Sequence, residues 1–225
     1  MPRFTLDREI RLIQDEVLLL GSLVEQALLN AVDALRRRDA EFAHQIERAD
    51  EAINEKRFAI ENHVLILIAT QQPMAHDLRL MAAILEVITE LERMGDYAKG
   101  IAKIAAGLAN DEIFIPIREI GFMADTAVSM LHRALGAFIA EDVSLAYSIA
   151  EEDQQVDELY NTVYYKVVQN MIANPSTIDN TNHILWVLHN IERTADRVTN
   201  ICERTVFIAT GDMLELDTSD DEKDV

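Results

Sequence analysis

Two segments of the sequence each place a glutamate and an aspartate four residues apart. Glu92 and Asp96 form the first pair and Glu192 and Asp196 form the second, both inside apolar patterns with helical spacing. Residues i and i+4 share one face of a helix, so each pair directs two carboxylates to the same side. Close carboxylates repel one another unless a cation or a proton relieves the repulsion. The spacing therefore predicts cation binding.

Oxygen-bearing side chains with the same spacing occur earlier in each half. They are Asp153 with Asp157 in the second half, and Asp50 with Asn54 in the first. If the two helices of each half pack antiparallel, four such side chains face one another and form a site for a hard metal ion. Because Asn54 supplies one negative charge fewer, we expect the first site to bind metal more weakly than the second.

Two other interpretations of these acids stay open. Such pairs are also common on solvated helix faces, so the protein could be a plain helical scaffold. A ferritin-like di-metal carboxylate protein would use Glu-x-x-His motifs, and the sequence has one, Glu41 to His44, with no counterpart at residues 144–147. No phosphate-binding loop, nucleophile elbow, zinc-protease motif or dinucleotide fingerprint occurs, so we expect no enzyme.

The composition excludes several kinds of partner. The 225 residues include 40 acidic and 20 basic side chains, for a net charge of −20, which disfavours nucleic acids and anionic membrane surfaces. The same charge suits cations and basic patches on partner proteins. The single cysteine, Cys202, excludes an intramolecular disulfide, and no signal-like segment or long apolar run is present. We expect a soluble cytoplasmic protein with no direct membrane insertion.

The apolar periodicity predicts an all-α protein of six long helices. The expected helices span about 6–38, 39–70, 73–107, a segment centred on 124–138, 142–173 and 177–210. Asp39 and Asp142 are suited to N-caps, Pro73 to the first turn of the third helix, and Gly211 to a helix end.

The second half of the sequence repeats the first. Asp39, Ile46 and Asp50 align with acidic or apolar residues 103 positions later, whereas the acid-pair helices align with an offset of 100. This period predicts two tandem three-helix bundles, over 1–109 and 110–211. The remaining residues, 212–225, are acidic with few apolar side chains, so we expect a disordered tail.

Four motifs in the two halves together point to a known family. They are Gln-Pro-Met-Ala-His-Asp-Leu-Arg-Leu at 72–80, Glu-Leu-Glu-Arg-Met-Gly-Asp at 90–96, Ile-Glu-Arg-Thr-Ala-Asp-Arg at 191–197 and Asn-Ile-Cys-Glu at 200–203. These motifs resemble those of the PhoU family of regulators of bacterial phosphate uptake. The resemblance covers roughly residues 5–216. The family pattern has glycine before the last aspartate of each acidic motif, and here Gly95 keeps it whereas Ala195 does not.

The resemblance implies two three-helix bundles side by side and metal ions bound by carboxylates, iron first, with Mn, Mg or Zn as alternatives. The ligands that it implies are Asp50, Glu92, Asp96, Asp153, Asp157, Glu192 and Asp196. It further implies a negative regulator of phosphate uptake and of the phosphate-starvation response. Its partners would be the phosphate ABC transporter ATPase subunit, the phosphate sensor histidine kinase and a second copy in a homodimer.

Overall fold

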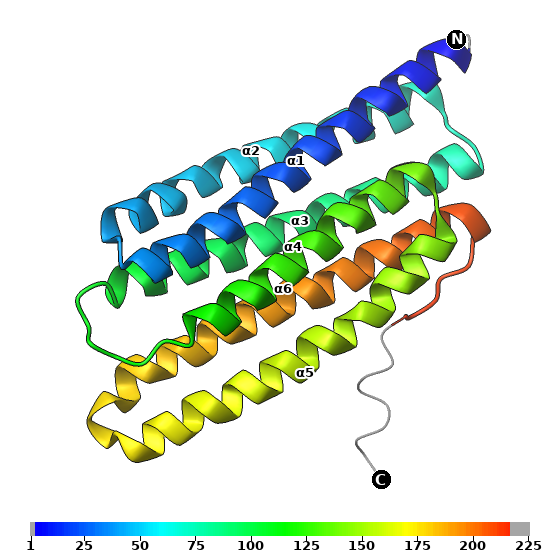
Figure 1. The fold of residues 1–225 in the computed structure, drawn as a ribbon. Coiled ribbons are helices and arrows are strands. Elements are labelled where there is room, and N and C mark those ends of the chain that lie inside the picture. The colour runs from blue at the N-terminus through cyan, green and yellow to red at the C-terminus, as the bar shows by residue number, and fades with distance from the viewer. Residues whose placement is uncertain (1–2, 217–225) are drawn as a thin grey trace.

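Six long antiparallel α-helices form the protein in a computed structural model that describes residues 3–216 (Figure 1). The elements are α1 (Arg3–Arg37), α2 (Ala40–Gln71), α3 (His76–Gly107), α4 (Ile117–Ala140), α5 (Val143–Ala173), the 3₁₀ turn η1 (Pro175–Thr177) and α6 (Ile178–Thr210). No strand occurs anywhere in the range 3–216, so the predicted all-α class is confirmed.

The helices form two three-helix bundles that lie side by side. Helices α1, α2 and α3 pack on one another, as do α4, α5 and α6, while α3 against α6 and α1 against α4 join the bundles. Buried side chains of both bundles belong to one continuous hydrophobic core. The predicted duplication is therefore confirmed as two packed copies of the same unit.

The helix ends follow local chemistry. The side chain of Asp39 accepts a hydrogen bond from the Phe42 N–H, and Asp142 accepts one from the Leu145 N–H. Each aspartate satisfies a backbone donor that the first helical turn leaves without a partner, as expected of an N-cap. Gly211 ends α6 with φ 87°, a left-handed conformation that glycine adopts without strain. These three predictions are confirmed.

The start of the third helix was predicted wrongly. Pro73 lies in the connection between α2 and α3, and α3 begins at His76 instead of at the proline. The first buried residues of α3 are Leu80 and Met81, whereas Met74 is 79% exposed. Another turn at the start of α3 would bury little apolar surface, so packing gives no reason to extend the helix.

Helix α1 approaches α4 closely at a glycine. A β-carbon added to Gly21 would lie 2.1 Å from Leu135 Cδ1, so the absent side chain makes room for that leucine. Residues Thr5–Arg37, which belong to α1, are the one described segment long and apolar enough to cross a membrane by length and composition. Because α1 packs against α2, α3 and α4, core packing accounts for the buried part of this segment, whereas its leucines at 12, 18, 19 and 23 are exposed. The absence of membrane insertion stays a prediction.

The chain after α6 keeps a contact with the second bundle. The Leu216 N–H donates to Glu203 Oε1 at 3.0 Å, and the Leu216 side chain packs against the core. This contact differs from the expectation that the whole segment 212–225 is disordered. The rest of that segment, 217–225, lies outside the described residues, so its disorder stays a prediction.

Two truncations are expected to differ in stability. A chain ending at Leu216 should keep the free energy of unfolding of the full chain, because residues 217–225 include one apolar residue, Val225. A chain ending at Gly211 should lose about 1–2 kcal/mol, from the Leu216 contact and the hydrogen bond to Glu203. Urea unfolding of both chains measures the difference, and equal midpoints would contradict a stabilising role for Leu216.

Candidate metal centre

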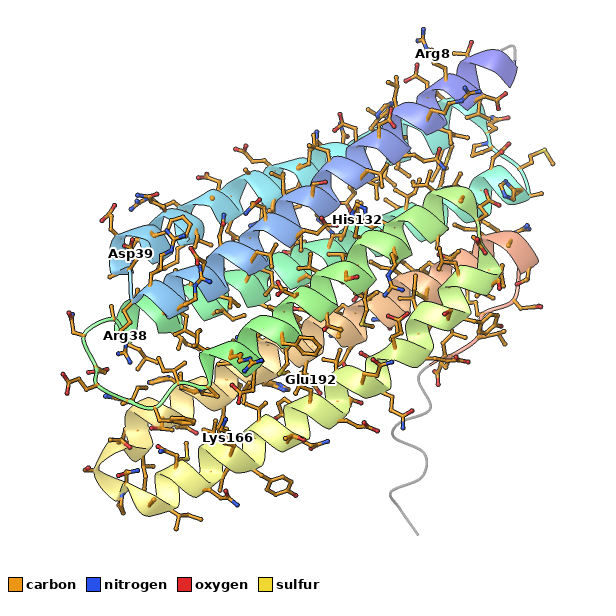
Figure 2. All side chains as sticks on the ribbon, in the orientation of Figure 1. Arg8, Arg38, Asp39, His132, Lys166 and Glu192 are labelled. Atoms are coloured by element: carbon orange, nitrogen blue, oxygen red, sulfur yellow. The ribbon has the colours of Figure 1, made fainter. Side chains whose placement is uncertain are left out.

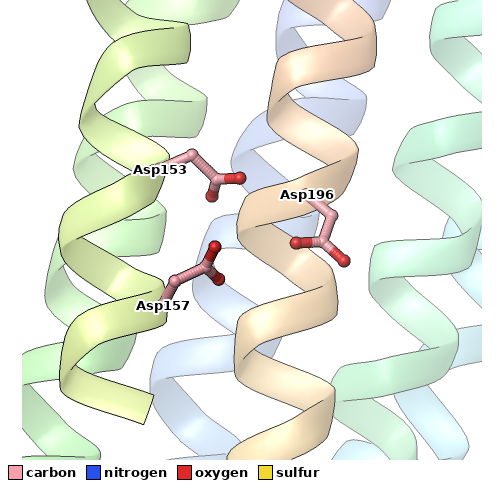
Figure 3. A group of neighbouring side chains, drawn as sticks. All are labelled: Asp153, Asp157 and Asp196. Atoms are coloured by element: carbon pink, nitrogen blue, oxygen red, sulfur yellow. The ribbon is translucent and has the colours of Figure 1, made fainter. Parts of the chain in front are cut away.

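Three aspartates meet between the second and third helices of the second bundle. Asp153 and Asp157 lie on α5 and Asp196 on α6, and one carboxylate oxygen from each lies within 4.8 Å of the others (Figure 3). The side chains point toward one another across the space between the two helices. Within residues 3–216 this is the one group of three such side chains that converges so closely. We call it the acidic cluster.

The spacing of the residues produces this arrangement. Asp153 and Asp157 are one turn apart on α5, and α6 runs antiparallel to α5, which brings the turn with Asp196 opposite them. Asp153 is 6% exposed, so its carboxylate has lost most of its hydration. Burial of carboxylates beside one another is unfavourable without a neutralising group. The donor set is all oxygen, which suits a hard cation.

Glu192 lies one turn before Asp196 on α6 (labelled in Figure 2). Its Oε2 is 3.2 Å from Nδ1 of His189, which is a further turn away. Burial lowers the pKa of His189, and Arg193 lowers it further, so the ring is predominantly neutral at neutral pH. Burial raises the pKa of Tyr160 on α5, with further contributions from Glu192 and Tyr164. Thus the acidic cluster is followed along α6 by Glu192 and His189, and along α5 by Tyr160.

His189 and Tyr160 were not predicted as part of the site. His189 is three residues before Glu192, and Tyr160 is three residues after Asp157. That helical spacing places each on the same face as its neighbouring acid and could have identified both. They are candidates for holding or orienting a ligand at the Glu192 end of the cluster.

The matching position in the first bundle is organised differently. Asp50, which is 4% exposed, is bonded at Oδ2 by Lys99 Nζ at 2.7 Å and by Asn54 Nδ2 at 3.1 Å. Its other predicted companions, Glu92 and Asp96, lie on α3 and do not converge with Asp50 as the second-half aspartates do. The ligand role of these three acids stays a prediction.

The carboxyl groups of Glu92 and Asp96 both have a raised pKa. Burial is the main cause that raises the pKa of each, and Asp96 and Asp50 respectively raise them further. Arg57 opposes the rise at Glu92, and the two lysines Lys99 and Lys103 oppose it at Asp96. Cationic side chains of the protein itself therefore offset part of the repulsion in the first bundle.

The glycine that differs between the halves has a packing role. A β-carbon on Gly95 would lie 3.1 Å from Ile53 Cδ1 and 3.6 Å from Asp50 Oδ1. In the second half the counterpart of Gly95 is Ala195, and the counterpart of Ile53 is the smaller Val156. Ala195 is completely buried within α6, so the extra methyl group is accommodated there.

The Glu-x-x-His motif is placed away from the acidic cluster. Glu41 lies 3.6 Å from Arg48, and His44 Nδ1 lies 2.9 Å from Glu47, all at the exposed beginning of α2. Neither residue belongs to a converging group of three possible ligands within the described chain. The motif gives no support to a ferritin-like site.

These features define a class: an all-helical protein of two duplicated three-helix bundles with a buried acidic cluster. The family model described as the PhoU domain matches residues 17–105 and again residues 120–205, one match for each bundle. The chain therefore belongs to the PhoU domain family.

Named relatives match over nearly the whole chain. A protein of Clostridium acetobutylicum named phosphate-specific transport system accessory protein PhoU homolog is 32% identical over 96% of this chain and 99% of its own. A protein of the same name from Streptococcus pneumoniae is 35% identical over 93% of this chain and 97% of its own.

Two solved structures share the fold. The crystal structure of PhoU from Pseudomonas aeruginosa has a TM-score of 0.85 and 32% identity, over 92% of this chain and 99% of that one. The crystal structure of the phosphate transport system regulatory protein PhoU from Streptococcus pneumoniae has a TM-score of 0.86 and 33% identity, over 93% of this chain and 99% of that one.

Proposed function

We propose that the protein regulates phosphate uptake and represses the phosphate-starvation response when phosphate is plentiful. The observation that carries this proposal is the match, over both bundles, to relatives named as accessory or regulatory proteins of phosphate transport. Those names describe transport accessories and no reaction, which fits the expectation that this protein is not an enzyme. That expectation itself stays a prediction.

The partners follow from the same proposal. The protein acts in the cytoplasm as an adaptor between the ATPase subunit of the phosphate ABC transporter and the phosphate sensor histidine kinase, and it forms a homodimer. Its net charge of −20 supports association with basic surfaces on these partners.

Metal binding at the acidic cluster is the second part of the proposal. Asp153, Asp157 and Asp196 supply the oxygen ligands, and Glu192 extends the set along α6. A hard cation such as iron, Mn or Mg fits this donor set, and Zn accepts carboxylate ligands as well. Its positive charge would offset the repulsion among the aspartates and so fasten α5 to α6. This role is structural and regulatory.

Deletion of the gene tests the regulatory role. We expect the deletion strain to express phosphate-starvation genes at high phosphate, because the signal that reports sufficient phosphate no longer reaches the kinase. A reporter fused to a starvation promoter measures this, with complementation by the intact gene as the control. Normal repression in the deletion strain would contradict the proposal.

A further inference from the structure

Lys99 places a positive charge inside the acidic group of the first bundle. Its ammonium lies 2.7 Å from Oδ2 of Asp50, a carboxylate that is 4% exposed, and the Asn54 amide bonds the same oxygen. A buried carboxylate requires a cation or donors to replace its hydration. Here the chain supplies both from its own side chains.

The repeat offsets identify what stands at the corresponding positions of the second bundle. The first-half residues Asn54, Arg57, Lys99 and Lys103 correspond to Asp157, Tyr160, Thr199 and Glu203. At every one of these four positions the first-half residue is the more positive of the two. Thr199, the counterpart of Lys99, directs its hydroxyl to the carbonyl oxygen of Asp196 at 2.7 Å and brings no charge.

The charge difference is large when these four positions are taken together with the three predicted acidic ligands of the first half. With Asp50, Glu92 and Asp96 included, the first half has three acids and three bases at seven positions, for a net charge of zero. The same seven positions of the second half have five acids and no base, for a net charge of −5. Arg57 attracts Glu92, and Lys103 attracts Asp96, so each first-half acid has a nearby cation.

We propose that the first bundle is a lysine-filled copy of the site, in which Lys99 takes the place of a metal ion and the second bundle alone binds metal. This inference rests on the proposed metal binding and departs from the sequence-based expectation of a weak first-half site. A metal ion entering the first bundle would have to displace the ammonium from Asp50 and would meet an amide at Asn54 instead of a carboxylate. Both differences lower the attraction for the ion.

The consequence is an asymmetric protein. Apolar side chains pack α2 on α3 and α5 on α6. Lys99 adds an ion pair between α2 and α3 at all metal concentrations, whereas the bound ion strengthens the contact between α5 and α6 only when metal is present. Metal therefore acts on one bundle of the two, and the first bundle serves as a fixed frame. Hydrogen exchange should show this directly, with added Mn²⁺ slowing the amides of α5 and leaving those of α2 unchanged.

Matched single variants test which bundle holds the ion. Protein freed of metal, loaded with Mn²⁺ and desalted should lose its metal in Asp196→Asn and keep the parent amount in Asp96→Asn. The two variants make the same change at corresponding positions. A loss of about half the Mn²⁺ in Asp96→Asn would overturn the proposal, because it would show that the first bundle binds metal beside Lys99.

A gain of metal is the second test. The variant Asn54→Asp/Lys99→Thr gives the first bundle the second-half residues, and its Mn²⁺ content should rise to roughly twice that of the parent. The control Lys166→Thr/Asn170→Asp makes the same change in net charge on a different helix, α5, and should leave the Mn²⁺ content unchanged. Circular dichroism verifies that both variants are folded.

The outcomes separate this inference from the proposed metal function. If the parent binds Mn²⁺ and the converted variant gains none, the role of Lys99 is refuted while second-half binding stands. If the parent binds none and the converted variant gains Mn²⁺, the role of Lys99 is supported and the proposed second-half site fails. If neither binds Mn²⁺, both ideas are refuted.

Discussion

Replacing Asp196 with asparagine is expected to lower the affinity for Mn²⁺ or Fe²⁺ by roughly 100-fold, which corresponds to about 2.8 kcal/mol. Asp196 is the α6 member of the acidic cluster, and its oxygen lies within 4.8 Å of oxygens from both α5 aspartates. Asparagine keeps the shape and one oxygen ligand but removes a negative charge, so the loss measures mainly the electrostatic part of binding.

The same substitution should leave the metal-free protein folded. It removes the charge of one of three neighbouring carboxylates and changes no residue of the apolar core. The free energy of unfolding of the metal-free form should therefore stay equal or rise. The parent should gain about 2.7 kcal/mol of stability when metal is present at 100 times its dissociation constant, and the variant should gain far less. Thermal unfolding with and without Mn²⁺ measures both effects.

Asp179→Asn is the matched control for this experiment. Asp179 is an exposed acid in the first turn of the same helix, far along α6 from the cluster. Its replacement should change neither the affinity nor the stabilisation by metal. If Asp196→Asn retains the affinity of the parent, Asp196 is not a ligand and the metal binds elsewhere. If the parent itself binds no metal, the scaffold interpretation is supported.

Local sequence signals predicted the helices well because their chemistry is local. Asp39 and Asp142 bond backbone donors three residues ahead, and Gly211 adopts a left-handed conformation, so each end depends on neighbouring residues alone. The prediction for the start of α3 failed because this start depends on which residues the helix packs against. The presence of Pro73 does not indicate that packing.

The acidic cluster was predictable in part. Helical spacing placed Asp153 with Asp157 and Glu192 with Asp196, whereas the antiparallel packing of their helices was only a condition of the prediction, which the structure meets. The ion pair from Lys99 to Asp50 was missed, although the repeat offset aligns Lys99 with Thr199 and exposes the difference. A comparison of the halves for bases as well as acids would have identified it.

The contacts between the two bundles could not be predicted from the sequence. Arg197 bonds Glu90 across the junction of α3 and α6, and Arg193 bonds the hydroxyl of Tyr97 in the same junction. The periodicity of a helix shows which face is apolar, but it does not show which face of a neighbouring bundle lies opposite a given polar side chain.

Replacing Arg197 with alanine is expected to have a large effect on stability, although this residue lies outside the apolar core. Arg197 lies 3.2 Å from Glu90 Oε2, and the side chains are 17% and 16% exposed. Its loss leaves the poorly hydrated Glu90 carboxylate with Asn200, whose amide bonds the same oxygen at 3.1 Å. We expect the free energy of unfolding to fall by about 2–3 kcal/mol, less than for a fully buried pair.

The double variant Glu90→Leu/Arg197→Leu distinguishes two contributions to the free energy of unfolding. One is the destabilisation caused by leaving Glu90 without Arg197, and the other is the stabilisation that the ion pair itself provides. Removing both charged groups leaves no carboxylate to be neutralised, so the double variant should be more stable than Arg197→Ala. Arg8→Ala is the exposed control, since Arg8 is 67% exposed beside Glu9 and should change stability by less than about 0.5 kcal/mol. Urea unfolding gives all three values.

Because this pair joins the bundles, Arg197→Ala should also make the two bundles unfold less cooperatively. A smaller dependence of the unfolding free energy on urea concentration would reveal this. A parent-like midpoint and slope would show that the apolar contacts of α3 and α6 hold the bundles together without the pair.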